Sequence, residues 1–349
     1  MLFRSVKIAF ISNYLNHHQI PFSNAMYEKT NHNYAFIQTE PMEEERKNMG
    51  WQFDDKKYPY LVKSYEDEER CRKWLLESDI VIAGSAPEEY LAERMKTGKM
   101  TFRYSERIYK RGQWRAVSPR GIYYMNQRHA KSEKKNVWLL CSSAYTPTDM
   151  DIFHFYKNRM FQWGYFPKTY RYDISKLLDK KREKKREIVW CARFMKLKHP
   201  EMMIKLAEYL KEHNYDEKYH ITMIGTGELR SLYEKLTEQK GLRDVLDIVG
   251  PLAPEEVRER MMDGYMFVAT SDYQEGWGAV LNEAMNSGCI VVASHAMGAT
   301  PFLIQHKKNG LIYRSGNQKD FFEQVKYAIE HEEEGINMAK SAYATITEY

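Results

Sequence analysis

Two glutamates, Glu275 and Glu283, stand eight positions apart around a glycine-rich turn. Gly276 and Gly278 follow an expected strand, and a helix is expected to begin near Ala279. Free backbone N–H groups at a helix start bind phosphate or the polar face of a sugar, and glycine permits close approach. Because two carboxylates would repel a phosphate, we expect each to accept hydrogen bonds from hydroxyls, one on a ribose and one on a sugar ring. The alternative is a helix-dipole acid at Glu275 and a surface acid at Glu283.

Two cations, Arg193 and Lys198, lie just beyond the C-terminal end of another expected strand. Fixed cations at that place can neutralise a diphosphate, and the guanidinium can do so through a bidentate fork. A pair of solvated surface cations is the alternative. Further along, Gly225 and Gly227 resemble half of a dinucleotide-binding fingerprint, but Arg230 stands where the third glycine would be. That segment predicts only a strand-to-helix turn that passes close to a ligand.

Short apolar segments alternate with amphipathic helical segments along the whole chain. The expected strands are residues 6–12, 34–38, 79–83, 100–104, 137–142, 188–192, 220–224, 246–249, 265–269, 290–294 and 310–313. The expected helices are residues 18–29, 66–77, 88–96, 121–131, 200–211, 228–239, 254–262, 279–287 and 319–330. This alternation predicts an α/β fold with parallel sheets covered on both faces, in which ligands bind at the carboxyl ends of the strands.

The chain is 349 residues long, which is more than one compact core usually holds, so we expect two domains. Residues 179–187 are nine consecutive charged residues, and we expect them to form a solvated hinge between two Rossmann-like domains. The predicted N-terminal domain spans residues 1–178 and the C-terminal domain residues 188–335. The remaining residues, 336–349, form a tail that could cross back to the N-terminal domain.

The composition excludes disordered and integral membrane proteins. Hydrophobic residues make up 43% and charged residues 29%, which is typical of a folded globular chain. No apolar run approaches the roughly 18 to 20 residues that span a bilayer. Arg4 and Lys7 interrupt the apolar N-terminus, so we expect a first strand there and not an export signal. The four cysteines lie far apart, without the spacing of a zinc or redox motif, which fits a reducing cytoplasm.

Positive charge is concentrated in residues 94–135, which we call the basic segment. It holds thirteen basic residues and two acidic ones, Glu106 and Glu133, although the whole chain has a net charge of only +5. One interpretation is a solvated helical face with core aromatics. The other is a surface for anionic lipid headgroups or lipid-linked phosphate, which cations attract and aromatics anchor. Nucleic acid is not expected as a partner, because no nucleic-acid-binding motif accompanies the charge. The basic residues are Arg94, Lys96, Lys99, Arg103, Arg107, Lys110, Arg111, Arg115, Arg120, Arg128, Lys131, Lys134 and Lys135.

On these residues, the second half of the chain resembles the donor-binding domain of family-4 glycosyltransferases, which are retaining enzymes of the GT-B fold. The resemblance covers roughly residues 188–330, whereas the first half matches only in its alternation of strands and helices. The matching segments, in the family's order, are Ala192-Arg193-Phe194 with Lys198, Gly225-Thr226-Gly227, Gly250-Pro251-Leu252, Glu275 to Glu283, Ile290 to Ser294, Gly298, and Asn309-Gly310-Leu311-Ile312.

The resemblance implies two Rossmann-like domains with parallel sheets that face each other across a cleft. It also implies transfer of a hexosyl group from a nucleotide-sugar donor to a glycan or lipid-linked acceptor with retention at the anomeric carbon, in surface polysaccharide or glycoconjugate synthesis. Such a protein would be cytoplasmic, at the inner face of a membrane. Two other classes remain open: an inactive nucleotide- or glycan-binding module, and a GT-B nucleotide-sugar epimerase, which would need more acids and histidines around the sugar.

The same resemblance implies roles for the residues of the donor site. Arg193 and Lys198 would hold the donor diphosphate, and Glu283 would bind the ribose hydroxyls. Leu252 would lie near the base. The remaining donor-binding positions, around the sugar and along the turns, are Gly227, Glu275, Gly276, Trp277, Gly278 and Ala279. No cofactor is expected, because the nucleotide-sugar is a substrate.

The acceptor side rests on fewer residues. His17 and His18 lie in the loop after the first strand, where a histidine is either solvated or part of the site. Glu106 follows a later strand, and its alternatives are an ion pair with Arg103 or Arg107 and a role in acceptor contact or proton handling.

No metal is expected, because two side-chain cations can replace an ion at the diphosphate. Asp149 and Asp151 have the spacing of a D-x-D metal motif, but they do not end an apolar strand. Their context predicts the N-cap of a helix instead.

Overall fold

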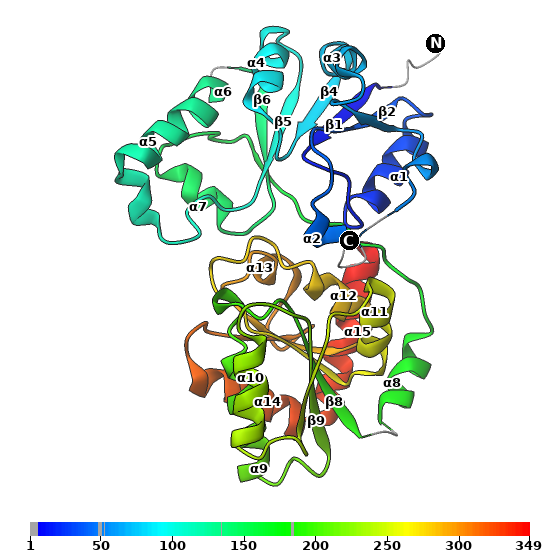
Figure 1. Cartoon of the computed structure of the whole chain (residues 1–349), viewed down its shortest axis with the longest axis vertical. Helices are drawn as coiled ribbons and strands as arrows, with labels where there is room; N and C mark the ends of the chain where they lie inside the picture. The colour runs from blue at the N-terminus through cyan, green and yellow to red at the C-terminus, as the bar shows by residue number, and fades with distance from the viewer. Residues whose placement is uncertain (1–5, 48–50, 52, 134, 183–184) are drawn as a thin grey trace. The chain divides into compact units, whose positions relative to one another are not determined.

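The computed structural model describes residues 6–47, 51, 53–133, 135–182 and 185–349 (Figure 1). The chain divides into two compact units, of which the first ends at Lys168 and the second begins at Thr169. The boundary predicted after residue 178 is therefore wrong, because the segment that follows Lys168 already belongs to the second unit. Within the described ranges, every helix is too short or too polar to cross a bilayer.

The first unit contains a seven-stranded parallel sheet in the order β3-β2-β1-β4-β5-β6-β7. Ile8, at the start of β1, pairs with Tyr34 of β2 on one side and with Ile80 of β4 on the other. The strand order reverses between β1 and β4, and ligands of such sheets bind at the carboxyl edge beside a reversal. The strands are β1 (Ile8–Ser12), β2 (Tyr34–Gln38), β3 (Leu61–Lys63), β4 (Ile80–Ala83), β5 (Thr101–Ser105), β6 (Val137–Cys141) and β7 (Met160–Gln162).

Helices cover both faces of this sheet. Since alternate residues of a strand point to opposite sides, each central strand contributes side chains to two cores. Ala9 and Ile11 enter the core shared with α3 and α4, whereas Ile8 and Phe10 enter the core on the other face. The helices are α1 (Ile20–Lys29), α2 (Glu44–Arg46), α3 (Glu68–Glu77), α4 (Glu88–Lys96), α5 (Pro119–Met125), α6 (Lys131–Glu133) and α7 (Thr146–Asp151).

The second unit contains a six-stranded parallel sheet in the order β10-β9-β8-β11-β12-β13. Its order reverses between β8 and β11, so the second unit repeats the logic of the first. The strands are β8 (Arg186–Cys191), β9 (Tyr219–Ile224), β10 (Leu246–Val249), β11 (Met266–Ala269), β12 (Ile290–Ser294) and β13 (Leu311–Tyr313). The helices are α8 (Ile174–Arg182), α9 (Glu201–Glu212), α10 (Arg230–Gln239), α11 (Pro254–Asp263), α12 (Val280–Asn286), α13 (Thr300–Leu303), α14 (Gln318–Glu330) and α15 (Glu332–Glu348).

The charged run 179–187 is not the solvated hinge that we predicted, although its residues 183–184 lie outside the described ranges. Lys181, in the last turn of α8, is buried, and its Nζ donates to four backbone carbonyls. Arg186 opens β8, is also buried, donates to the Tyr219 hydroxyl at 3.1 Å and pairs with Glu332. Buried cations are tolerated because each has close partners.

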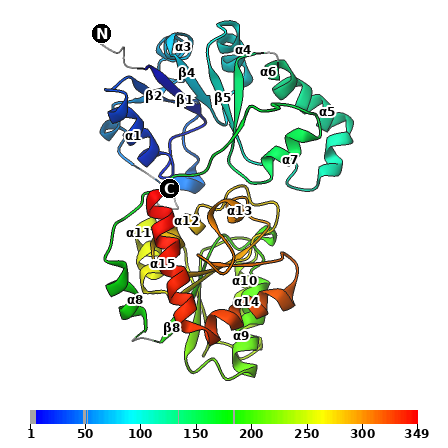
Figure 2. The same cartoon turned by 180° about the vertical axis from the view of Figure 1, so that it is seen from behind.

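The predicted tail, residues 336–349, packs within the second unit, and all of it except Tyr349 belongs to α15. Figure 2 shows α15 lying along one face of the second sheet, where it contacts β12, α12, α14 and α8. Gly335 allows this close approach, since a Cβ there would lie 2.7 Å from Ile290 Cδ1. Met338 and Ala339 then enter the core of the second unit, so the C-terminal helix is an integral layer of it.

Candidate functional site

The loop after β8 carries the two predicted diphosphate-binding cations. Arg193 is exposed at the carboxyl end of the strand, and Lys198 ends a short 3-10 turn before α9. Phe194 between them is fully buried, and its N–H donates to Thr226 O at 2.8 Å. The aromatic core therefore anchors the loop and leaves the cations at its surface.

The Gly225–Gly227 turn supports that loop from the neighbouring strand. Gly227 has φ 151°, and a Cβ there would lie 2.6 Å from Phe194 O. At Gly225, with φ 138°, a Cβ would lie 2.2 Å from Ala192 O. The sequence predicted that these glycines allow approach to a ligand; the structure shows that they allow approach to the backbone of the cation-bearing loop.

The loop after β11 is bound directly to the cation-bearing loop. The Asp272 N–H donates to Leu197 O at 2.9 Å, and the Thr270 hydroxyl donates to Lys198 O. The Glu275 N–H in turn donates to Asp272 O at 3.1 Å. This backbone network brings the Lys198 ammonium into an ion pair with the Glu275 carboxylate. The Lys198 side chain is 16% exposed and the Glu275 side chain 15%, so the ion pair is only partly hydrated.

Trp277 lies in the turn between Glu275 and α12, and its side chain packs inside the second unit. It is fully buried, and its indole N–H donates to Asn282 Oδ1 at 2.9 Å. Its backbone carbonyl accepts the N–H of Ala299 at 3.0 Å. Gly278 beside it has φ 91°, a conformation that favours glycine. The turn that precedes Ala279 is therefore held from inside the second unit, with Gly276 buried at its centre.

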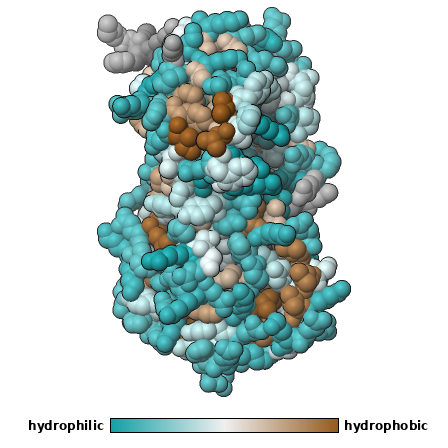
Figure 3. All heavy atoms as spheres, turned by 90° about the vertical axis from the view of Figure 1, so that its left-hand side faces the viewer, coloured by the Kyte–Doolittle hydropathy of each residue, from teal (hydrophilic) through white to brown (hydrophobic). Residues whose placement is uncertain are grey.

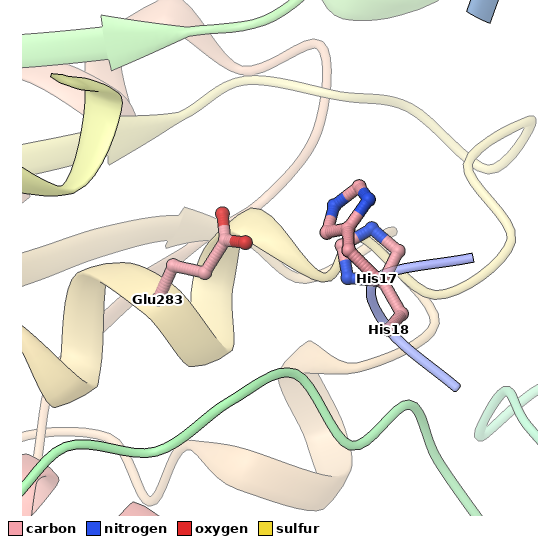
Figure 4. Close-up of side chains that lie close together, drawn as sticks. All are labelled: His17, His18 and Glu283. Carbon is pink, nitrogen blue, oxygen red and sulfur yellow. The ribbon is translucent and has the colours of Figure 1, made fainter. Parts of the chain in front are cut away.

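Glu283 projects from the first turn of α12 (Figure 4). Burial raises the pKa of its carboxyl group to about 7. Cys191, at the end of β8, lies close to it: burial, followed by the Glu283 charge, raises the pKa of this thiol to about 12, while the Lys198 charge opposes the shift. Glu283 and Lys198 therefore both lie near the Cys191 thiol, at one edge of the second sheet.

Leu252, which we predicted to lie near the base, is in the loop between β10 and α11 and is half-buried. The following Ala253 N–H donates to the Glu256 carboxylate at 2.8 Å, which fixes the start of α11. Leu252 thus follows a strand of the same sheet, two positions in the strand order from β8. The structure gives it no direct contact with Glu283 or Lys198 among the described interactions.

In the first unit, Tyr165 joins His18 and Glu106, a role that the sequence did not reveal. The Tyr165 hydroxyl donates to Glu106 Oε1 at 2.7 Å, and its ring centre lies 5.9 Å from that of His18. The His17 and His18 rings lie against each other, with centres 3.8 Å apart (Figure 4). Burial, followed by the charge of His17, holds the pKa of His18 well below its usual value. His18 is therefore neutral at physiological pH, so its ring can donate one hydrogen bond and accept another.

The ion pair predicted for Glu106 is wrong in its partner. Glu106 accepts from Lys110 Nζ at 2.5 Å. Arg103 instead forms a two-pronged ion pair with Glu88, at 3.0 and 2.8 Å, and Arg107 pairs with Asp149 at 3.4 Å. Both arginines are buried, so their ion pairs lie within the interior of the first unit.

Asp149 is not the helix N-cap that we predicted. It lies inside α7, where Tyr145 is the N-cap. Its fully buried carboxylate accepts the N–H groups of Ile108 and Tyr109 at 2.8 and 2.9 Å. Asp151 is exposed, so the two carboxylates of the D-x-D pattern have different surroundings. Asp149 anchors the start of the loop that leads to α5.

The basic segment is not uniformly a surface. Arg94 is fully buried, and its guanidinium donates to the Thr101 hydroxyl and to four backbone carbonyls. Lys134 lies outside the described residues. The basic residues that are exposed are Lys96, Lys99, Arg111, Arg115, Arg120, Lys131 and Lys135. Burial thus removes Arg94, Arg103 and Arg107 from any surface role, and for the exposed cations both interpretations stay open.

Comparisons with known proteins identify relatives of the second unit. Residues 176–345 match the family model described as "Glycosyl transferases group 1". A D-inositol 3-phosphate glycosyltransferase from Corynebacterium aurimucosum is 24% identical over 159 residues, which cover 44% of this chain. The match spans only 37% of that relative's length.

Comparisons of the fold extend over nearly the whole chain. The Anabaena protein Alr3699/HepE, solved in complex with UDP, has a TM-score of 0.71 and 15% identity, covering 98% of this chain and 95% of that one. A glycosyltransferase from Rickettsia africae has a TM-score of 0.71 and 12% identity, covering 99% and 94% respectively. At these identities the likeness establishes the fold alone.

Proposed function

We propose that this chain, which has the GT-B glycosyltransferase fold and matches the group 1 glycosyl transferases over residues 176–345, transfers a glycosyl group from a nucleotide-sugar donor. The observation that carries this proposal is the Lys198–Glu275 ion pair, with Glu283 near it around the Cys191 thiol. Lys198, Glu275 and Glu283 thus lie at one edge of the sheet. A nucleotide-sugar needs such a set, with a cation for its diphosphate and a carboxylate each for its sugar and its ribose hydroxyls.

The reaction proposed is transfer of a hexosyl group with retention at the anomeric carbon. Departure of the nucleotide leaves negative charge on the diphosphate, and the preorganised cations Lys198 and Arg193 stabilise that charge as it develops. Glu275 accepts hydrogen bonds from sugar hydroxyls, and ionised Glu283 accepts them from the ribose. The amides of Gly276 to Gly278 complete the sugar site, and Leu252 contacts the base.

Uridine diphosphate sugars are the first donors to test, because the Anabaena neighbour was solved with UDP. The acceptor is proposed to be a glycan or a lipid-linked glycan, in surface polysaccharide or glycoconjugate synthesis at the cytoplasmic face of a membrane. His18 is neutral and stands beside Tyr165 and Glu106 in the first unit, which suits contact with an acceptor hydroxyl. No cofactor is proposed.

The proposal is tested by nucleotide release from a panel of nucleotide-sugars, each with and without simple glycoside acceptors. We expect release with at least one donor, and its loss in Lys198→Met. Binding of nucleotide without release would instead identify an inactive binding module. Interconversion of the sugar without release would identify an epimerase. Retention is tested separately by NMR, since an α-linked donor should give an α-linked product.

A further inference from the structure

We propose that the first unit docks on an anionic lipid membrane through one exposed surface beside α5. This α5 surface consists of the apolar and aromatic side chains Trp114, Val117, Ile122, Tyr123 and Tyr124, together with Arg111, Arg115 and Arg120. The inference rests on the proposed function only in its purpose, which is to bring the enzyme to a lipid-linked acceptor. The docking itself follows from exposure, anchoring and charge.

The apolar part of the α5 surface is unusually exposed for side chains of its size. Trp114 is 67% exposed, Val117 75% and Tyr123 66%. Ile122 and Tyr124 are 41% and 40% exposed. Figure 3 faces the side on which α5 lies and shows apolar side chains gathered over this part of the first unit. Single exposed apolar residues are ordinary, but a contiguous group of them is typical of an interaction surface.

This exposure is built into the local structure. Ser118 caps α5: its Oγ accepts the Gly121 N–H at 3.1 Å and donates to Arg115 O at 2.6 Å. A Cβ at position 121 would lie 2.0 Å from Arg115 O, so the turn into α5 is tight. The opposite face of the segment is anchored by Ala116 and Met125, which are buried in the core. With one face held in the core, the other is presented to the surroundings.

The charge of the α5 surface is positive and uncompensated. Residues 107–132 contain no aspartate or glutamate. Arg107, Lys110 and Arg128 pair with acids from outside that stretch. Arg111, Arg115 and Arg120, by contrast, have no carboxylate within ion-pair distance among the described residues, and Arg115 lies over the Trp114 ring at 5.4 Å.

These two properties favour a lipid surface over a protein or nucleic-acid partner. Tryptophan and tyrosine are enriched at the level of lipid headgroups, because one part of each ring is apolar and the other can hydrogen-bond. Arginine is attracted to an anionic leaflet over a distance of roughly a Debye length. A short, rigid segment that presents both kinds of side chain together combines electrostatic attraction with shallow insertion.

Co-sedimentation of the full chain with vesicles tests the proposal. Vesicles of phosphatidylcholine alone are compared with vesicles that also contain phosphatidylglycerol, at low and high salt. We expect binding only to the anionic vesicles, and weaker binding in high salt. The triple variant Arg111→Ser/Arg115→Ser/Arg120→Ser should bind about 100-fold more weakly, at about fivefold for each cation near the surface. The matched control, Lys235→Ser/Lys308→Ser/Lys340→Ser, removes three exposed lysines of the second unit and should retain binding.

Insertion is tested by quenching of tryptophan fluorescence with lipids that carry brominated acyl chains. Quenching should be lost in Trp114→Phe, and binding should fall in Trp114→Ser/Val117→Ser/Tyr123→Ser. No binding to anionic vesicles at low salt, or equal loss in the lysine control, would overturn the proposal. So would self-association of the lipid-free protein that the same apolar substitutions abolish, because the surface would then join two copies. Nucleotide release without vesicles is measured in parallel, so failure of docking is distinct from failure of the transferase proposal.

Discussion

The Lys198 ammonium and the Glu275 carboxylate form an ion pair across two loops that follow neighbouring strands, β8 and β11. The two residues are 77 positions apart in the chain. The backbone hydrogen bond from the Asp272 N–H to Leu197 O ties the two loops together. In the proposed function, this ion pair would keep a cation for the diphosphate and an acceptor for sugar hydroxyls in one place.

Removal of Glu275 should separate turnover from nucleotide binding. In Glu275→Ala we expect nucleotide release to slow by about 10²-fold, since positioning of the sugar is lost. Affinity for free UDP should stay the same or increase slightly, because Lys198 loses its competing carboxylate. Lys198→Met should slow nucleotide release by about 10²- to 10³-fold and should also weaken the binding of UDP. Calorimetry with UDP, alongside steady-state release, measures both; equal loss of UDP affinity in the two variants would contradict the assignment.

Glu283 should make UDP affinity depend on pH. Its carboxyl pKa is about 7. The ionised carboxylate can accept hydrogen bonds from two hydroxyls, whereas the protonated form carries a hydrogen on one oxygen and accepts less well. Nucleotide binding should therefore tighten as pH rises from 6 towards 8, by up to about tenfold for each pH unit below the pKa. Glu283→Gln should bind UDP more weakly and without this dependence. A variant that binds UDP normally but loses affinity for the sugar conjugate would show that Glu283 contacts the sugar instead.

The same raised pKa of Glu283 should make the folded protein less stable as pH rises, although UDP binding becomes tighter. A carboxyl group whose pKa is higher in the folded than in the unfolded state binds more protons when folded, so the free energy of unfolding falls as pH rises between about 4.3 and 7. Since Glu283 is partly exposed, we expect the loss to be about 1 to 2 kcal/mol. Glu283→Gln should remove it, and chemical denaturation at pH 5 and pH 8 compares the two proteins.

The central strands and several helices were predictable because their sequence signals are local. The predicted bounds of β2, β10, β12 and α4 are those of the structure. β3 and β7 were not predicted, because three-residue edge strands are too short to show periodicity. α15 was also missed; its three consecutive glutamates at 332–334 resemble a solvated segment, although its next turns pack in the core.

The position of the proposed donor residues at strand ends was predictable from spacing, but the contacts that support them were not. Glu275, Glu283 and Lys198 stand beside strand ends, and parallel sheets bring strand ends to one edge. Tyr165, by contrast, reaches Glu106 across 59 residues, and nothing in its local sequence marks it. The charged run failed as a hinge for a related reason, because the carbonyls that Lys181 binds come from two distant helix ends.

Lys181 should be required for stability of the second unit. Its Nζ donates at 2.6 to 3.0 Å to carbonyls at the C-terminal ends of α11 and α12. Lys181→Met would leave the buried Ser287 and Gly288 carbonyls without this donor, and Met261 and Gly264 with only the weak Cys289 thiol. We expect a loss of about 3 kcal/mol or more. The neighbouring Lys180, 63% exposed and 3.7 Å from Asp263, is the control, and Lys180→Met should change stability by less than about 0.5 kcal/mol. Urea denaturation followed by circular dichroism makes the comparison; equal effects would contradict the capping role.

Turnover should survive metal chelation. The departing diphosphate must be neutralised, and Lys198 and Arg193 offer fixed cations at the edge of the sheet where it would lie. Nucleotide release measured in EDTA should equal release in buffer with magnesium. Complete loss of release in EDTA that is restored by magnesium or manganese would overturn this expectation. The variant Arg193→Met provides the positive arm, since a reaction that depends on side-chain cations should slow when one is removed.

His199 should hold the two site loops together in a manner that depends on pH. The residue follows Lys198 with φ 50°, and its Nδ1 lies 2.6 Å from Glu201 while its Nε2 lies 3.4 Å from Asp272. Hydrogen bonding to Glu201 is the main cause of a raised pKa for His199, which Asp272 raises further and partial burial opposes.

Since the folded-state pKa of His199 is raised, its stabilising contribution is fully present below the unfolded value of about 6.5 and is lost as pH rises through the folded value. His199→Asn, which tolerates a positive φ, should lower the free energy of unfolding by about 1 kcal/mol at pH 6 and by much less at pH 9. It should also slow turnover more at pH 6 than at pH 9, because protonated His199 bonds to Asp272, whose carbonyl accepts the Glu275 N–H. His213 is the control: it is an exposed histidine after α9 whose ring bonds to the Tyr209 carbonyl and stacks on the Tyr209 ring. If His213→Asn has the same pH-dependent effect, the network around His199 is not its source.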